Sequence, residues 1–442
     1  MGNLSTPVSV QKLQRALQAK AKEAPQLRFH ALYDKVYRAD VLAHAYATCR
    51  ANRGVEGVDG QRFEDIEAYG VDRWLGELAE DLRGKRYRPQ AVKRVYIPKP
   101  NGRQRPLGIP TIRDRVVQTA TMRVLESIFE PDLPTEQFAY RSDRSALDAV
   151  RRVHWLLNDG HREVIDADLS DYFGSIPHAE LLACVARRVV DRQVLHLIKM
   201  WLVAPVEQID ERDHKKRVSE NRDDNRGIPQ GAPISPLLSN LYMRRFVLGW
   251  KRLGYEQRFG AHIVNYADDL VICCLTQAEE ALLAMRRIMT RLKLTVNEEK
   301  TRRCRVPEED FDFLGYTFGR CYSGRTQRAY LGTRPSRKSL HRLIRAISEA
   351  TTRRTLLMEP EAVVDRLNRM VRGWTQYFQL GSVSKAYRTI DQHAPRRLCR
   401  WLCMKHKKRG TNRRRYPDTY LHGTLGLLST QVIAQNLPWA RT

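Results

Sequence analysis

The chain has 442 residues, 42% of them hydrophobic, which suffices for about two to four folded units and excludes an intrinsically disordered protein. Its net charge of +27 favours a polyanionic partner, and nucleic acid is a better candidate than a membrane surface. No apolar run approaches the roughly 20 residues that span a bilayer, and the N-terminus lacks the apolar region of a signal peptide.

Hydrophobic periodicity and turn signals predict helices and strands along the first three quarters of the chain. Helices are expected over residues 13–24, 31–54, 71–87, 112–130, 145–160, 178–190, 191–206, 227–250 (after its prolines) and 277–294. Strands are expected over 91–100 and 103–110 with an Asn-Gly turn between them, over 162–173, as a hairpin over 262–274, and as a strand pair over 311–320. The charged run 210–226 is expected to form a solvated hairpin or loop. This mixture indicates an α+β or mixed α/β sheet.

The last fifth of the chain carries nearly half of the net charge. Residues 351–442 hold 18 Lys and Arg against five Asp and Glu, an excess of 13. An apolar stripe at helical spacing over residues 363–378 predicts a bundle helix, whose other face is either merely solvated or turned to phosphate. The basic clusters that follow favour nucleic acid. The candidate nucleic-acid-binding residues are Arg366, Arg369, Arg372, Lys407, Lys408, Arg409, Arg413, Arg414 and Arg415.

Eight cysteines are scattered along the chain without CxxC pairs. Cys399 and Cys403 would share a helix face, and His393 and His406 are near in sequence, so one interpretation is a zinc site. Buried thiols in a reducing cytosol are the favoured interpretation.

The segment HIVNYADDLVICC, residues 262–274, sets two adjacent acids, Asp268 and Asp269, inside an apolar run. Carboxylates are rarely buried without a partner, because desolvation favours protonation unless a cation compensates. The usual remedy is a divalent metal ion, and Mg²⁺ prefers carboxylate oxygens together with substrate phosphate. A lone Asp-Asp pair is more often an exposed turn, but the apolar flanks on both sides favour a functional pair.

A third acid, Asp168, ends another apolar strand and precedes an aromatic pair. Two metal ions about 3.5–4 Å apart need two or three carboxylates from neighbouring strands. Asp166 and Asp168 are two residues apart, so they share one face of the strand, but Asp166 lies deeper. Asp171 is three residues from Asp168 and falls on the opposite face. The sequence therefore predicts a site for two Mg²⁺ ions on Asp168, Asp268 and Asp269, and Mn²⁺ suits the same ligands.

Six ordered blocks of the chain resemble the reverse transcriptases encoded by group II introns. The blocks are RVYIPKPNGRQRPLGIPTIRDRVVQTA, IDADLSDYFGSIPH, NRGIPQGAPISPLLSNLYM, YADD, LKLTVNEEKTR and FDFLGYTFG. They occur in the order and approximate spacing of that family, and the resemblance covers roughly residues 30–430. Six blocks in order are far more specific than any one of them.

The resemblance implies an α+β right-hand polymerase with fingers, a palm built on an antiparallel sheet and a helical thumb, mostly helical outside the palm. The expected divisions are 1–88 for an N-terminal extension and the start of the fingers, 89–165 for the fingers, 166–335 for the palm, and 336–442 for the thumb or maturase domain with its basic tail. The palm range includes part of the fingers and a charged insertion near 207–226.

In this resemblance, the three acids named above match the metal-binding acids of the palm. Phe173 matches the bulky residue that packs on the incoming sugar and rejects the 2′-OH, although an ordinary core Phe is the alternative. Gln230 matches a residue that lines the nucleotide pocket. Lys99 and Arg105 match the fingers cations that clamp the triphosphate, although cations on a surface turn are usually only solvated.

The implied activity is that of an RNA-directed DNA polymerase, a nucleotidyltransferase that binds its intron RNA, assists splicing and copies the RNA into DNA during intron mobility. The implied partners are intron or other template RNA, a DNA primer or target and deoxynucleoside triphosphates, in a bacterial cytosol near the nucleoid and away from membranes.

Two alternatives stay open. One is a domesticated reverse transcriptase in DNA repair or phage defence, and the other is an RNA-binding splicing factor, a maturase, with incidental polymerase activity. Because the chain has no room after the thumb for the endonuclease of many relatives, it resembles the endonuclease-lacking branch. The cognate RNA, the primer and the oligomeric state do not follow from the sequence.

Overall fold

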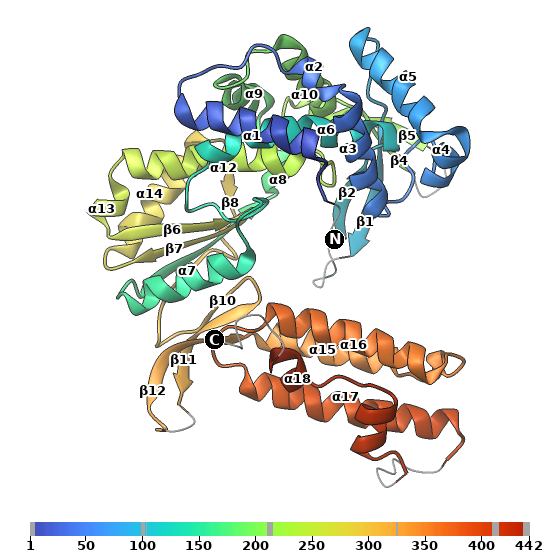
Figure 1. Cartoon of the computed structure of the whole chain (residues 1–442). Coiled ribbons are helices and arrows are strands. Elements are labelled where there is room, and N and C mark those ends of the chain that lie inside the picture. Colours follow the sequence, from blue (N-terminus) through green and yellow to red (C-terminus); the bar gives the residue numbers. More distant parts are fainter. Residues whose placement is uncertain are drawn as a thin grey trace.

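A computed structural model describes residues 5–98, 102, 104–209, 215–323, 326–408 and 415–435. Figure 1 shows helices α1–α6 at one end, a sheet flanked by helices in the middle, and a helical bundle with the red C-terminal segments at the other end. No helix in these ranges is long and apolar enough to cross a membrane.

The N-terminal helices pack around the buried helix α6. The bounds are α1 (Val8–Glu23), α2 (Tyr33–Val36), α3 (Ala39–Ala51), α4 (Phe63–Tyr69), α5 (Val71–Arg83) and α6 (Ile112–Phe129), followed by the 3-10 turn η1 (Glu130–Asp132). The expectation of one helix over residues 31–54 was wrong, because the chain is extended at Arg38 and divides there into α2 and α3. The Arg38 guanidinium pairs with Asp40 at 2.7 Å in the first turn of α3, which holds the break in place.

A four-stranded sheet of order β2-β1-β4-β5 lies beside these helices. The bounds are β1 (Val92–Pro98), β2 (Gln104–Ile109), β4 (Val206–Ile209) and β5 (Lys215–Val218), with the short helix α11 (Glu220–Asp223) after them. The β1–β2 hairpin is antiparallel, as predicted from its Asn-Gly turn. The described part of the charged run 210–226 contributes to the β4–β5 hairpin. Strand β4 also pairs with β1 in parallel, a pairing that the local sequence does not predict.

The central sheet has the order β6-β7-β3-β8, and β9 also pairs with β3. The bounds are β3 (Glu163–Ser170), β6 (Ala261–Tyr266), β7 (Asp269–Cys274), β8 (Thr295–Val296) and β9 (Arg302–Arg305). Alternate side chains serve two cores: Ile165 and Ile272 pack with the helices of one face, and Val164 and Val271 pack with α7 on the other. Burial on both faces explains why β7 is apolar after Asp269.

Helices cover both faces of this sheet. They are α7 (Ala146–Asn158), α8 (Tyr172–Ser175), α9 (His178–Ala186), α10 (Arg192–Leu202), α12 (Ser235–Arg252), α13 (Tyr255–Arg258) and α14 (Ala278–Arg291). Helix α7 begins with a capping box in which Ser145 and Asp148 satisfy each other's backbone amides.

A three-stranded antiparallel sheet leads into the C-terminal bundle. Its strands are β10 (Phe311–Phe313), β11 (Tyr316–Tyr322) and β12 (Ala329–Pro335), and the bundle comprises α15 (Arg337–Ala350), η2 (Arg353–Thr355), α16 (Pro360–Tyr377), α17 (Ser384–Lys405), the π-helical turn η3 (Tyr420–Thr424) and α18 (Thr430–Gln435). On α16, Val363, Leu367 and Val371 are buried in a separate core, as their helical spacing predicts. The bundle therefore has its own apolar interior.

Candidate active site

The two adjacent acids lie at the tip of the β6–β7 hairpin. Strand β6 ends at Tyr266, and β7 begins at Asp269, so Asp268 occupies the turn. Ala267 adopts a left-handed backbone with φ of 59°, which an L-residue adopts only at a cost. The buried side chain of Asn265 braces the turn, because its Nδ2 donates to the carbonyl of Ala267 at 2.8 Å and to that of Asp269 at 3.3 Å. Sequence reasoning missed this brace.

Asp168 lies directly opposite Asp269 in the register of β3 and β7. Opposed residues have Cβ atoms about 4.5–5.5 Å apart, so the third acid reaches the same site as the pair. Asp168 Oδ2 accepts hydrogen bonds from Asn297 Nδ2 at 2.9 Å and from Lys300 Nζ at 3.0 Å. Both donors belong to the LTVNEEK block, whose contribution to this site the sequence did not reveal.

The two competing acids are occupied elsewhere. Asp166 pairs with Arg302 on the neighbouring strand β9 at 3.3 Å. Asp171 sits in a left-handed turn with φ of 42° before α8, and it lines a different pocket. The two-residue period of the strand thus separates Asp168 from Asp171, as expected.

Burial and the neighbouring acids raise the affinity of Asp269 for protons. Asp269 is exposed as a residue, but many protein atoms surround its carboxyl group and partly desolvate it. This burial raises the pKa of Asp269 from its ordinary 3.8 to about 7, with further contributions from Asp268, Asp166 and Asp168, while Arg105 opposes the shift. The site therefore concentrates negative charge that a cation would relieve.

The donor set suits a hard divalent cation, since Asp168 and Asp269 lie opposite each other on paired strands and Asp268 adjoins them in the turn. Within the described residues, no three His, Cys, Asp or Glu side chains are already arranged as a metal-ligand cluster. The Lys300 ammonium instead stands against Asp168. The residues therefore fit the ion by their chemistry, while Lys300 partly fills its electrostatic role.

A cavity of about 630 Å³ opens beside the acids. It is lined by Arg105 from β2, Phe173 from α8, Gln230 and Asp268, so the predicted nucleotide-pocket residues that the structure describes lie together. Lys99 lies outside the described residues. Sequence reasoning missed Tyr140, which lines the same cavity with a left-handed backbone, and burial followed by the charge of Asp268 raises the pKa of its hydroxyl.

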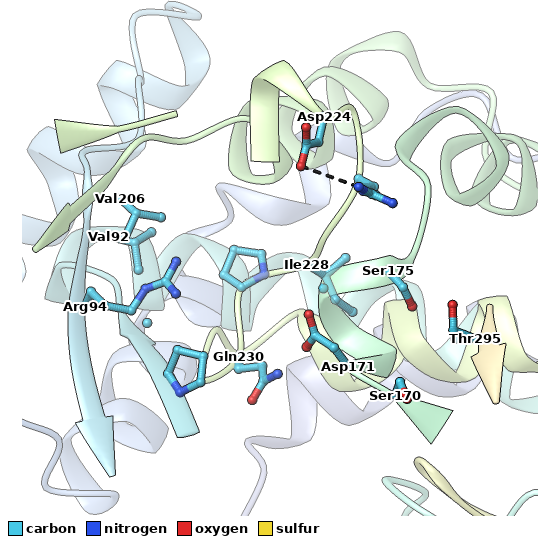
Figure 2. Close-up of a pocket in the computed structure, with 15 residues that line it drawn as sticks. Val92, Arg94, Ser170, Asp171, Ser175, Val206, Asp224, Ile228, Gln230 and Thr295 are labelled. Atoms are coloured by element: carbon cyan, nitrogen blue, oxygen red, sulfur yellow. Dashed lines mark ion pairs between the residues drawn. The ribbon is translucent and has the colours of Figure 1, made fainter. Parts of the chain in front are cut away.

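Gln230 also borders a second pocket of about 460 Å³. Figure 2 shows Arg94 of β1 on one side of this pocket and Asp171 and Ser175 on the other, with Gln230 between them. Asp224 is held in an ion pair near its rim, at 3.7 Å from Arg226. Gln230 therefore lines both cavities.

The predicted basic residues divide between exposed helix faces and the chain's tail. Arg366, Arg369, Arg372, Lys407, Lys408 and Arg415 are exposed, whereas Arg409, Arg413 and Arg414 lie outside the described residues. Arg369 lines a cavity of about 790 Å³ between the bundle and the β10–β11 turn, together with Lys338, Arg342 and Trp374. Lys338 and Arg342 stand on the first turns of α15 and were not singled out from the sequence.

The alternative of a zinc site finds no support in the described part of the chain, which holds no such ligand cluster. Cys399 and Cys403 are buried in the bundle core, and His393 Nε2 is within 3.0 Å of Ser348 Oγ. Buried thiols, the favoured interpretation, are what the structure contains at these two positions.

Acids at adjacent strand ends, a cavity beside them with a cation, an aromatic ring and an amide, and a separate basic helical bundle together define the architecture of a nucleic-acid polymerase. A family model described as "Reverse transcriptase (RNA-dependent DNA polymerase)" matches residues 97–318, and one described as "Group II intron, maturase-specific domain" matches residues 340–417. The chain belongs to the group II intron reverse transcriptases, with an RNA-dependent DNA polymerase domain followed by a maturase domain.

Three curated relatives illustrate the range of similarity. Protein YkfC of Escherichia coli is 31% identical over 368 residues, which cover 75% of this chain and 93% of that protein. The group II intron-encoded protein LtrA of Lactococcus lactis is 30% identical over 227 residues, covering 50% of this chain and 36% of the relative. A putative COX1/OXI3 intron 1 protein of Saccharomyces cerevisiae is 26% identical over 360 residues, covering 67% of this chain and 42% of the relative.

Proposed function

We propose that the protein binds the RNA of its own group II intron, assists its splicing and copies RNA into DNA during intron mobility. One observation carries the proposal: the chain joins a polymerase domain, whose acids lie beside a nucleotide-sized cavity, to a maturase domain with exposed basic helices. A binding-only maturase has no need to keep three carboxylates together at a cost in electrostatic repulsion.

Asp168, Asp268 and Asp269 are the residues that would hold two Mg²⁺ ions. When bound, such ions lower the pKa of the primer 3′-hydroxyl and neutralise the charge of the leaving pyrophosphate. Around them, Asn265 fixes the turn that carries two of the acids, and Asn297 orients the carboxylate of Asp168.

The cavity beside the acids accounts for the choice of nucleotide. Arg105 supplies a cation for the triphosphate, and Lys99, six residues earlier in the sequence, is proposed as its partner. Phe173 would pack against the sugar, where a bulky ring leaves no room for a 2′-hydroxyl. Gln230 and Tyr140 complete the wall around the incoming base and sugar.

The C-terminal bundle is the proposed thumb, and the first helices form the proposed N-terminal extension and fingers. Exposed Arg366, Arg369 and Arg372 on α16 would contact phosphates of bound RNA or of the template–primer duplex. Such contacts hold nucleic acid without reading its sequence, which suits a protein that must copy a whole intron.

The proposal is tested by separating its two activities. The double variant Asp268→Ala/Asp269→Ala should lose primer extension on an RNA template by at least about a thousandfold, because both carboxylates leave the site. Binding to intron RNA and stimulation of splicing should persist, since they depend on the bundle. Full primer extension by this variant would refute the assignment of the acids.

The two alternative functions predict different outcomes in splicing and mobility assays. A domesticated polymerase should extend primers but give no stimulation of splicing for the RNA that surrounds its coding frame. A splicing factor with incidental polymerase activity should support intron mobility equally well with and without Asp268 and Asp269. A mobility assay that compares wild type with the Asp268→Ala/Asp269→Ala variant distinguishes both alternatives from the proposed function.

A further inference from the structure

A cavity of about 480 Å³ lies on the protein away from the acids, between α9, α12 and the segment after α1. Five arginines line it: Arg187, Arg188, Arg244, Arg245 and Arg252. The acidic residues in its wall are Asp132 and Glu180, so the cavity has an excess of three positive charges. The cavity shares no lining residue with the one beside Asp268.

The two acids of the wall are already used by other partners. Asp132 pairs with the buried Arg188 at 3.2 Å, and Arg188 also donates to the carbonyl of Ala21 at 2.9 Å, so this arginine serves the fold. Glu180 pairs with Lys293 on its other side. Neither acid is therefore fully available to the remaining arginines.

Arg245 contributes a buried donor to this cavity. Its guanidinium carbon lies 5.3 Å from the centre of the Tyr242 ring, which orients it, and its Nη1 is buried without a hydrogen-bond partner among the described residues. A buried cationic donor without an acceptor is unfavourable, so such donors usually have a partner from the protein, an ordered water or a bound ion.

Arg244 is exposed to the same excess of positive charge in the cavity wall. Burial lowers the pKa of its guanidinium, Asp132 opposes this, and the neighbouring Arg187 and Arg252 lower it further. Arg187 and Arg252 are exposed at the mouth, where they can meet a ligand that extends into solvent. The geometry thus combines a buried donor, a cationic wall and an open rim.

Guanidinium groups present paired donors that match the oxygens of phosphate. We infer that this cavity is a phosphate-binding site that takes a backbone phosphate of a folded RNA segment, other than the strand being copied. The assignment of the phosphate to RNA rests on the proposed function, whereas the prediction that the cavity binds phosphate does not. Helix α12 links the two sites: its first turn lines the nucleotide cavity at Ser235 and Pro236, and Arg245 follows nine residues later, about 14 Å along the axis.

The test uses the full chain preloaded with an unlabelled template–primer duplex, so that the polymerase cleft is filled. Binding of a fluorescent hairpin RNA is then measured by anisotropy as a function of salt. The pocket variant is Arg245→Gln/Arg252→Gln, and the matched control is Arg287→Gln/Arg291→Gln, which removes two exposed charges of α14 outside the cavity. Arg188 is left intact because it holds the fold together.

The pocket variant should bind the hairpin about tenfold more weakly than the wild type, with a salt slope lower by about one to two, while the control changes affinity less than about twofold. Primer extension on the short duplex should be unchanged in both, which shows that the variants fold. Equal hairpin affinity in the pocket and control variants would overturn the inference while leaving the proposed polymerase intact.

A second arm identifies the source of the phosphate. Inorganic phosphate and AMP are titrated against wild type and the pocket variant, and the melting temperature is recorded. A rise for wild type alone, combined with normal hairpin affinity of the variant, would overturn the RNA assignment in favour of a free phosphate compound. Loss of primer extension in the pocket variant would overturn the independence of the two sites.

Discussion

The crowded acids make a prediction about stability as well as catalysis. Asp269 binds its proton more tightly in the folded protein than in the unfolded chain, because its folded pKa is about 7 against an ordinary 3.8. Its ionisation therefore destabilises the fold progressively as pH rises from about 4 to about 7, and the penalty is complete above that range. Replacing Asp269 with Asn removes the ionisable proton and should stabilise the metal-free protein at neutral pH.

The size of the effect follows from the shift. A rise of about three in pKa corresponds to at most about 4 kcal/mol, since one unit is about 1.36 kcal/mol. Because Asp269 is exposed, solvent screens part of this free energy, and we expect about 1–2 kcal/mol. For a chain of this size, that free energy raises the melting temperature by about 1–3 °C.

The assay is thermal unfolding of wild type and Asp269→Asn with a chelator present, between pH 5 and 8.5. The advantage of the variant should be small at pH 5 and largest at pH 8. Asp143→Asn, in an exposed turn before α7, is the matched control and should show no such trend. With Mg²⁺ in about tenfold excess over its dissociation constant, wild type should gain about 1.4 kcal/mol, and the variant should gain less. A variant that is less stable than wild type at pH 8 without metal would refute the reasoning.

Three further changes test the surroundings of the site. Phe173→Val should raise ribonucleotide incorporation relative to deoxynucleotide about tenfold or more in primer extension, and an unchanged ratio would remove Phe173 from sugar selection. Asn265→Ala loses two hydrogen bonds to the turn. The free energy of unfolding should therefore fall by about 1–3 kcal/mol, and primer extension should fall about tenfold. Unchanged primer extension would mean that the turn keeps its shape without Asn265. Replacing Arg366, Arg369 and Arg372 by Gln should lower RNA affinity and reduce the salt slope by about two, whereas an unchanged slope would assign them to a solvated surface.

Strand ends and apolar runs could be predicted from the sequence because their signals are local. The run before Asp168 and the run after Asp269 are β-forming segments, and both became strands of the central sheet. Helix α7 was predicted over residues 145–160 from its apolar spacing, and the structure has it at Ala146–Asn158. The break between α2 and α3 was missed, because an extended residue such as Arg38 leaves no trace in a pattern of apolar positions.

Pairing partners, by contrast, could not be read from the sequence. Neither the parallel contact of β4 with β1 nor the placement of Asn297 and Lys300 against Asp168 has a local signal, since each joins segments more than about a hundred residues apart. Asn265 looks like any polar residue in a strand until its amide is seen to bridge a left-handed turn.

The sequence by itself determined the class of chemistry and the type of ligand. Adjacent acids within apolar flanks, a third acid at the end of another strand and a charge of +27 follow from composition and spacing alone. The tertiary structure decided how these groups meet: strand register sets Asp168 opposite Asp269, and the meeting of helices α9 and α12 gathers arginines that are scattered in the chain. The physical reason is that ionisation energies depend on separation in space and on exclusion of water, and only the fold sets both.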